Sequence, residues 1–327
     1  MASSGPTSRT GPSMSELPRR RQSGSSGGAS QRKGPAAPGG AACGPSKGTP
    51  VRTREIIGLL PVTLYLLAFT LAPLASTVLL SAGAPGGRIT LDYFHRIIDH
   101  FQFGEAVVNT LVVTGIGLTL ELVLGLAAAL ALASRPPGRA FFQLLLLTPL
   151  GVPTIVSAAV MRSVFGTVGY LNEALLRLGV IRTPVGWVGN RGLALLTVAI
   201  ADVWKVTPLM MLIVLAGLQA IPRELYEAAR TDGASCWRQF VAITLPLLKP
   251  ALTMALIVRG VDAFRIFALP LALVGRGFPV LSTYAYVEYL EYGNPHTAAA
   301  SSVILLGIIL LTVLLYLKLA GPEEVLR

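Results

Sequence analysis

Among the charged residues within long apolar stretches, six have the side chains best placed to do chemistry. They are Glu121, Asp202, Lys205, Arg259, Asp262 and Arg265. Asp202 and Lys205 are three residues apart, which places them on one face of a helix. Asp262 is three residues from both Arg259 and Arg265, so it can reach either of them. An ionised side chain at the centre of a bilayer costs about 2.5–3.5 kcal/mol.

That cost requires the charges to face the interior of a helix bundle, to pair, or to lie near a membrane surface. Two interpretations stay open. In the first, a polar translocation path or gate is lined by Asp202, Trp204, Lys205, Arg259, Asp262 and Arg265. In the second, the charges form a structural ladder of ion pairs. Glu121 is more typical of a packing or subunit-interface carboxylate than of a solute ligand.

The sequence contains no catalytic or metal-binding constellation. Cys43 and Cys236 suit neither a disulfide framework nor a metal site. The three histidines form no ligand cluster with acidic residues at helical spacing. No Gly-x4-Gly-Lys-Ser/Thr phosphate loop occurs, so the chain is not expected to hydrolyse ATP. We therefore expect neither an enzyme nor a chain that binds a metal or cofactor itself.

The apolar stretches around these charges indicate an all-α, polytopic membrane protein. Only 13% of the 327 residues are charged, whereas soluble proteins have about 25%. Six stretches are long enough to cross roughly 30 Å of hydrocarbon as helices. A helix satisfies its own backbone hydrogen bonds in lipid. The six transmembrane helices are predicted at residues 56–80, 106–134, 141–165, 193–219, 248–273 and 299–319.

The formal charge of +11 is interpreted as a topology signal. No basic stripe interleaved with aromatic residues occurs, which argues against nucleic-acid binding. Lys and Arg are concentrated in residues 1–53 and in the loops on that side of the bundle, including residues 220–247. Because positive residues favour the cytoplasm, both termini are expected inside. Residues 1–53 are predicted to be a disordered basic cytoplasmic tail, and residues 54–327 the membrane domain.

The cytoplasmic segment at residues 220–247 contains a short helix that local signals predict. Pro222 suits the first helical position, where its missing N–H costs nothing. Ala228 and Ala229 contribute a small-residue face that allows close approach of a partner surface. Gly233 supplies a left-handed residue that ends the helix.

The spacing in this segment resembles the coupling motif of ABC importer permeases. That motif consists of Glu-Ala-Ala, three residues, Gly, nine residues and then Ile-x-Leu-Pro. The matching residues are Glu227, Ala228, Ala229, Gly233, Ile243, Leu245 and Pro246. Other runs are similar to the carbohydrate-uptake branch, of the maltose and glycerol-phosphate type. They are Trp204-Lys205, Gly217 to Pro222, Asp232 to Ser235, Phe264 to Phe267 and Tyr284-x-Tyr286.

The resemblance implies that this cytoplasmic helix couples the bundle to ATPases. The residues that would carry this coupling are Glu227, Ala228, Ala229, Asp232, Gly233, Leu245 and Pro246. The implied partners are a second homologous permease subunit, a cytoplasmic dimer of ABC ATPases that bind ATP and Mg, an extracytoplasmic solute-binding protein and the lipid bilayer. The chain is thus expected to be the permease subunit of an ATP-driven importer in the cell (inner) membrane, for a sugar or related polyol.

Two alternatives belong to other classes of transporter. One is an ABC permease for a non-sugar solute such as a peptide or amino acid. The other is an ion-coupled secondary carrier in which Asp202, Asp262 or Glu121 takes protons. A membrane-embedded enzyme would require catalytic pairs or metal ligands inside the spans, and the sequence has none.

Deleting residues 1–48 is expected to leave assembly and transport largely intact. The deleted segment has no apolar periodicity and ends before the first predicted span. Solute uptake and co-purification of the ATPase subunits measure the effect. Loss of ATPase binding by the truncated chain would contradict this expectation.

Overall fold

The computed structural model describes residues 53–83 and 89–320, and side chains from Leu60 onward. The predicted tail, residues 1–53, therefore lies outside the described residues except for the backbone of Thr53. Chain contacts separate Met1–Leu59 from Leu60–Arg327, and the description below concerns the second unit.

The described residues form helices and no strand, apart from one isolated bridge between Gly83 and Ile89. The longer helices are α1 (Thr53–Ala82), α3 (Phe101–Ala133), α4 (Arg139–Gly151), α5 (Thr154–Phe165), α7 (Arg191–Ala220), α10 (Leu245–Phe264) and α13 (Pro295–Ala320). The shorter ones are α2 (Asp92–Ile98), α6 (Tyr170–Arg177), α8 (Arg223–Thr231), α9 (Cys236–Gln239), the π-helix η1 (Phe240–Thr244), α11 (Ala268–Leu273) and α12 (Leu281–Leu290).

Six segments of the described chain are long and apolar enough to cross a membrane, which confirms the predicted all-α polytopic fold. They are Leu60–Ala82, Phe101–Ala133, Thr154–Arg177, Arg191–Ala220, Cys236–Phe264 and Pro295–Ala320. Four of them match the predicted spans to within a few residues. The third and the fifth differ.

The prediction of a single helix over residues 141–165 is wrong. The chain forms α4 and α5 instead, because Pro153 lacks an N–H and holds the preceding Val152 in an extended conformation. With 13 residues, α4 is too short to cross the hydrocarbon. By length and composition the third candidate span is Thr154–Arg177, which comprises α5 and α6.

The predicted fifth span, residues 248–273, is displaced. The helical segment begins at Cys236 and runs through η1 into α10, so the end of the predicted 220–247 loop is part of the span. Helix α10 ends at Phe264, and α11 begins only at Ala268. The residues of α11 are as apolar as those of α10. The hydropathy of the sequence therefore does not reveal the break between the two helices.

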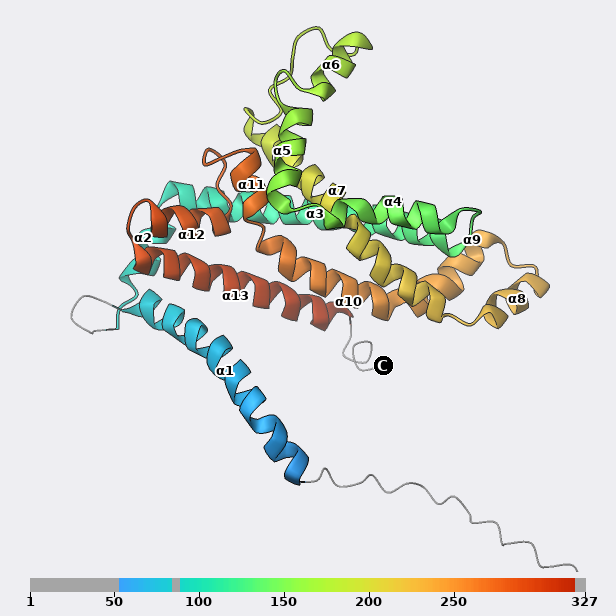
Figure 1. The fold of residues 1–327 in the computed structure, drawn as a ribbon, viewed down its shortest axis with the longest axis horizontal. Helices are drawn as coiled ribbons and strands as arrows, with labels where there is room; N and C mark the ends of the chain where they lie inside the picture. Colours follow the sequence, from blue (N-terminus) through green and yellow to red (C-terminus); the bar gives the residue numbers. More distant parts are fainter. Residues whose placement is uncertain (1–52, 84–88, 321–327) are drawn as a thin grey trace, which may run out of the picture. The chain divides into compact units, whose positions relative to one another are not determined.

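Helices α3, α7 and α10 run side by side and form the centre of the described bundle (Figure 1). A core of buried apolar side chains joins them: Ala129, Leu132, Met210, Met211, Val214, Leu215, Leu248 and Ala255. Helices α8 and α9 lie at one end of this group, and α2 and α12 lie at the other (Figure 1).

Two glycines let these helices approach closely. A Cβ at Gly125 of α3 would lie 2.6 Å from Met210 Cγ of α7. A Cβ at Gly217 of α7 would lie 2.4 Å from Ala251 Cβ of α10. Small residues at helix interfaces are typical of membrane bundles, where packing supplies much of the stability.

The segment between α5 and α7 is organised by the buried side chain of Asn172. Its Nδ2 donates to the carbonyls of Val185 and Thr167 at 2.9 and 3.0 Å. Its Oδ1 accepts from Trp187 Nε1 at 3.0 Å and from the Val185 N–H at 3.1 Å. One amide thus satisfies several backbone groups of a segment that has little regular structure.

Replacing Gly217 by alanine is expected to destabilise the bundle by about 1–3 kcal/mol, because the new methyl group overlaps Ala251. The thermal unfolding midpoint of the purified chain in detergent measures this. Gly115→Ala in α3 is the matched control, since nothing lies within 4 Å of its Cβ position. Equal midpoints for the two variants would show that the α7–α10 contact is loose.

Candidate functional site

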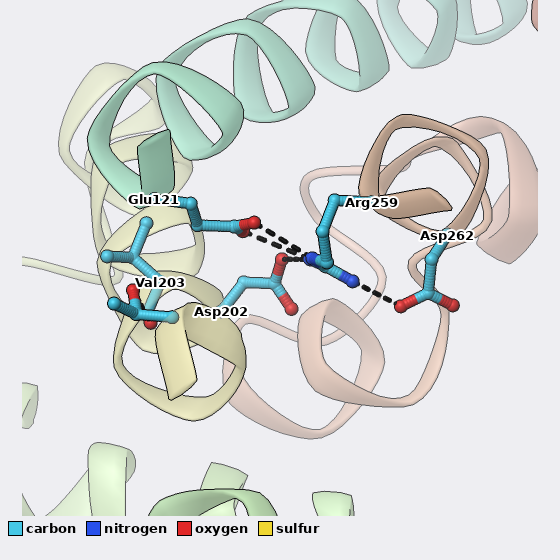
Figure 2. A network of polar contacts seen from close by, with 6 residues as sticks. Glu121, Asp202, Val203, Arg259 and Asp262 are labelled. Atoms are coloured by element: carbon cyan, nitrogen blue, oxygen red, sulfur yellow. Dashed lines mark hydrogen bonds and ion pairs between the residues drawn. The ribbon is translucent and has the colours of Figure 1, made fainter. Parts of the chain in front are cut away.

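Four ionisable side chains from three central helices meet in one cluster (Figure 2). Arg259 of α10 lies in the middle, and Glu121 of α3, Asp202 of α7 and Asp262 of α10 surround it. Arg259 Nε and Nη2 donate to the two carboxylate oxygens of Glu121 at 2.8 and 3.0 Å. Nη2 also donates to Asp202 Oδ2 at 3.3 Å, and Nη1 donates to Asp262 Oδ2. We call these four residues the Arg259 cluster.

The four side chains of the Arg259 cluster range from fully buried to largely exposed. The side chains of Arg259 and Glu121 are 0% exposed, that of Asp202 is 14% exposed and that of Asp262 is 67% exposed. The enclosed pair has the two-pronged geometry that makes arginine–carboxylate contacts strong and specific. Three carboxylates face one guanidinium group. The cluster therefore has more hydrogen-bond acceptors than the guanidinium group can satisfy.

Spacing along single helices identified only part of this arrangement. The predicted contact between Asp262 and Arg259 is present, whereas Arg265 is exposed and forms no ion pair in the described part of the chain. Glu121, which the sequence assigned to packing or a subunit interface, is the main partner of Arg259. The two residues are 138 positions apart, so no local pattern connects them.

Lys205 does not join the Arg259 cluster, although it is one helical turn from Asp202. Its Nζ donates to the carbonyl oxygen of Val152, the residue between α4 and α5. That carbonyl is available because Val152 is extended and the helix is interrupted there. A side-chain donor thus satisfies the backbone at a broken helix, as membrane interiors require.

Trp204 also lies apart from the Arg259 cluster. It lines an apolar groove of about 530 Å³ between α3, α4 and α7, together with Leu145 and Pro149. It is two positions from Asp202, and such residues point to different sides of a helix. Of the six predicted path residues, Asp202, Arg259 and Asp262 therefore lie together. Trp204, Lys205 and Arg265 lie apart from them.

The helix predicted within residues 220–247 is present as α8, with Pro222 directly before it and Gly233 just after it. Gly233 has a φ of 75°, and the Ala234 N–H donates to the carbonyl of Ala229 at 2.9 Å, which closes the helix end as expected. Asp232 is the C-cap residue. Most of α8 is exposed, including Glu227 and Ala228, while Ala229 is half-buried.

A second contact ties α8 to the span that follows it. The hydroxyl groups of Tyr226 in α8 and Thr244 in η1 are 3.0 Å apart and share a hydrogen bond. Leu245 and Pro246 then begin α10. Sequence analysis did not predict η1, a single π-helical turn of the kind that often occurs at functional sites.

Residues 121–319 match a protein family described as the binding-protein-dependent transport system inner membrane component. The chain is 37% identical over 271 residues to the trehalose/maltose transport system permease protein MalF of Thermococcus litoralis, covering 80% of this chain and 91% of that protein. It is 32% identical over 273 residues to the arabinooligosaccharides transport system permease protein AraP of Bacillus subtilis, covering 80% and 86%.

A solved structure has the same fold. It is a chain of a bacterial alginate ABC transporter in complex with an alginate pentasaccharide-bound periplasmic protein. The TM-score is 0.74 at 22% identity, and the match covers 83% of this chain and 95% of that one.

Arg259→Gln is expected to destabilise the chain by about 3–5 kcal/mol, because it leaves buried Glu121 without its counter-charge. The control is Arg265→Gln, which removes an exposed arginine near the end of the same helix and should change stability by less than about 0.5 kcal/mol. Thermal unfolding in detergent measures both. Similar midpoints for the two variants would show that the buried pair contributes nothing to stability.

Proposed function

Since this chain belongs to the family of binding-protein-dependent transport system inner membrane components, we propose that it is the permease subunit of an ATP-driven importer for a sugar or related polyol. It is a multi-pass membrane protein. The specificity class rests on its relatives, since the proteins similar to it include permeases for trehalose/maltose and for arabinooligosaccharides.

The observation that carries the proposed mechanism is the position of α8 between α7 and the segment that becomes α10. The chain leaves α7 at Ala220, forms α8 and returns through α9 and η1. The hydrogen bond between Tyr226 and Thr244 closes this connection. Helices α7 and α10 carry Asp202 and Arg259, so a displacement of α8 can reach the Arg259 cluster through these two helices.

The Arg259 cluster suits a solute rich in hydroxyl groups. Asp262 is largely exposed and Asp202 is partly exposed, so both can accept hydrogen bonds from a passing ligand. Hydrogen bonds to a carboxylate are roughly twice as strong as those between neutral groups. We assign Asp202 and Asp262 to the translocation path, and buried Arg259 and Glu121 to positioning them.

The remaining assignments follow from the family. A binding protein outside the cell delivers the solute, in keeping with the family's description. A second homologous permease subunit completes the path, and a cytoplasmic dimer of ABC ATPases binds ATP and Mg. Both termini lie in the cytoplasm, with residues 1–53 as a tail and residues 54–327 as the membrane domain. The partners are proposals that rest on the family, and the orientation is a proposal supported by the positive charges on one side of the bundle.

Glu227→Lys and Gly233→Asp are each expected to uncouple ATP hydrolysis from transport while the chain still inserts. We propose that Glu227 accepts a charge-assisted hydrogen bond from an arginine of the ATPase, which a lysine cannot do. An aspartate at Gly233 must adopt a positive φ, which is unfavourable for residues with a Cβ. Substrate-stimulated ATP hydrolysis and uptake in reconstituted membranes measure coupling.

The matched control is Glu224→Lys, which makes the same charge change at an exposed position of α8 outside the motif. It should retain uptake close to that of the wild type. The coupling assignment fails if both motif variants also transport at wild-type rates with the ATPase still attached.

A further inference from the structure

A cavity of about 770 Å³ lies where the α3–α4 connection meets the start of α8. Its walls include Leu130 and Ala133 near the end of α3, and Leu218 near the end of α7. Both helices are candidate membrane spans that end at these residues. The cavity therefore lies at the level of a membrane surface, on the side that carries α8.

Four arginines line this cavity: Arg135, Arg139, Arg223 and Arg230. The first two come from the connection between α3 and α4, and the other two come from α8. Glu227 is the single acidic residue among the lining residues. No ion pair or side-chain hydrogen bond involves any of the four arginines in the described part of the chain. We call this site the arginine cavity.

The local backbone makes three of these arginines costly to keep. Arg135 has a φ of 54°, the only positive value at a residue other than glycine among the described residues. The left-handed region disfavours residues with a Cβ, so glycine would fit this position better. Arg139 and Arg223 are the first residues of α4 and α8, where the helix dipole disfavours a cation. An anion in the cavity would offset this unfavourable interaction at the two helix N-termini.

We propose that the arginine cavity binds a phosphate-bearing anion that bridges the α3–α4 connection and α8. Arginine matches the geometry of phosphate oxygens and donates two hydrogen bonds at once. The phosphate belongs either to the headgroup of an anionic phospholipid or to a free phosphate compound, since both present the same oxygens. The bound anion neutralises the cluster and holds α8 against the bundle.

The test compares the full-length chain with the double variant Arg135→Gly, Arg139→Gln, which leaves α8 unchanged. Native mass spectrometry measures retention of phosphatidylglycerol against phosphatidylcholine, and thermal unfolding with added inorganic phosphate measures the free ion. The wild-type chain should retain phosphatidylglycerol preferentially, and the double variant should lose roughly tenfold or more in affinity. Added salt should weaken the binding.

Arg238→Gln is the matched control, because Arg238 is exposed on the same side of the bundle and does not line the cavity. Arg135→Gly alone guards against misfolding, since glycine suits the backbone there. Retention of phosphatidylglycerol without a response to phosphate identifies the lipid, and a response to phosphate alone identifies the free ion. Either result supports the site, provided that the double variant shows neither the retention nor the response.

Two outcomes overturn the proposal. In the first, the double variant binds phosphatidylglycerol and phosphate as tightly as the wild-type and Arg238→Gln chains do. In the second, the wild-type chain binds neither anion. Because the assay reads binding to the permease chain itself, its result is independent of whether the transported solute is a sugar.

Discussion

The buried guanidinium group of Arg259 is the constraint on which the central bundle depends. A charged group that is 0% exposed needs counter-charges within hydrogen-bonding distance, and these come from α3 and α7 as well as from α10 itself. The requirement fixes the rotation of all three helices, because Glu121 and Asp202 must face the same point. Apolar packing alone would tolerate several rotations, since residues on many sides of these helices are apolar.

Much of the architecture follows from the sequence because its physical causes are local. Six apolar segments satisfy a length requirement set by the bilayer, and the limits of α8 follow from Pro222 and Gly233. The break at Val152 was missed, although Pro153 indicates it, because prolines are common inside membrane helices and most of them do not interrupt the span. The end of α10 was missed because the hydropathy of α11 continues that of α10.

The candidate sites were less predictable because their contacts are distant in sequence. The helical period shows which residues share a face, and it correctly paired Asp262 with Arg259. It cannot show which helix opposes that face, so Glu121 was not identified as the main partner. The arginine cavity was hidden for the same reason. Arg135 and Arg223 are far apart in the sequence and belong to segments whose positive charge had already been explained as a topology signal.

The close contact between Gly217 and Ala251 has a mechanical consequence. Because Gly217 has no side chain, α7 and α10 approach closely at one point, which favours rotation about that point over sliding. At 1.5 Å per residue, Asp202 lies roughly 22 Å from this pivot along α7, whereas the end of α7 at Ala220 lies only about 5 Å from it. The helix is thus a lever with unequal arms. A small displacement of α8 at the short arm would be magnified several-fold at the carboxylate on the long arm.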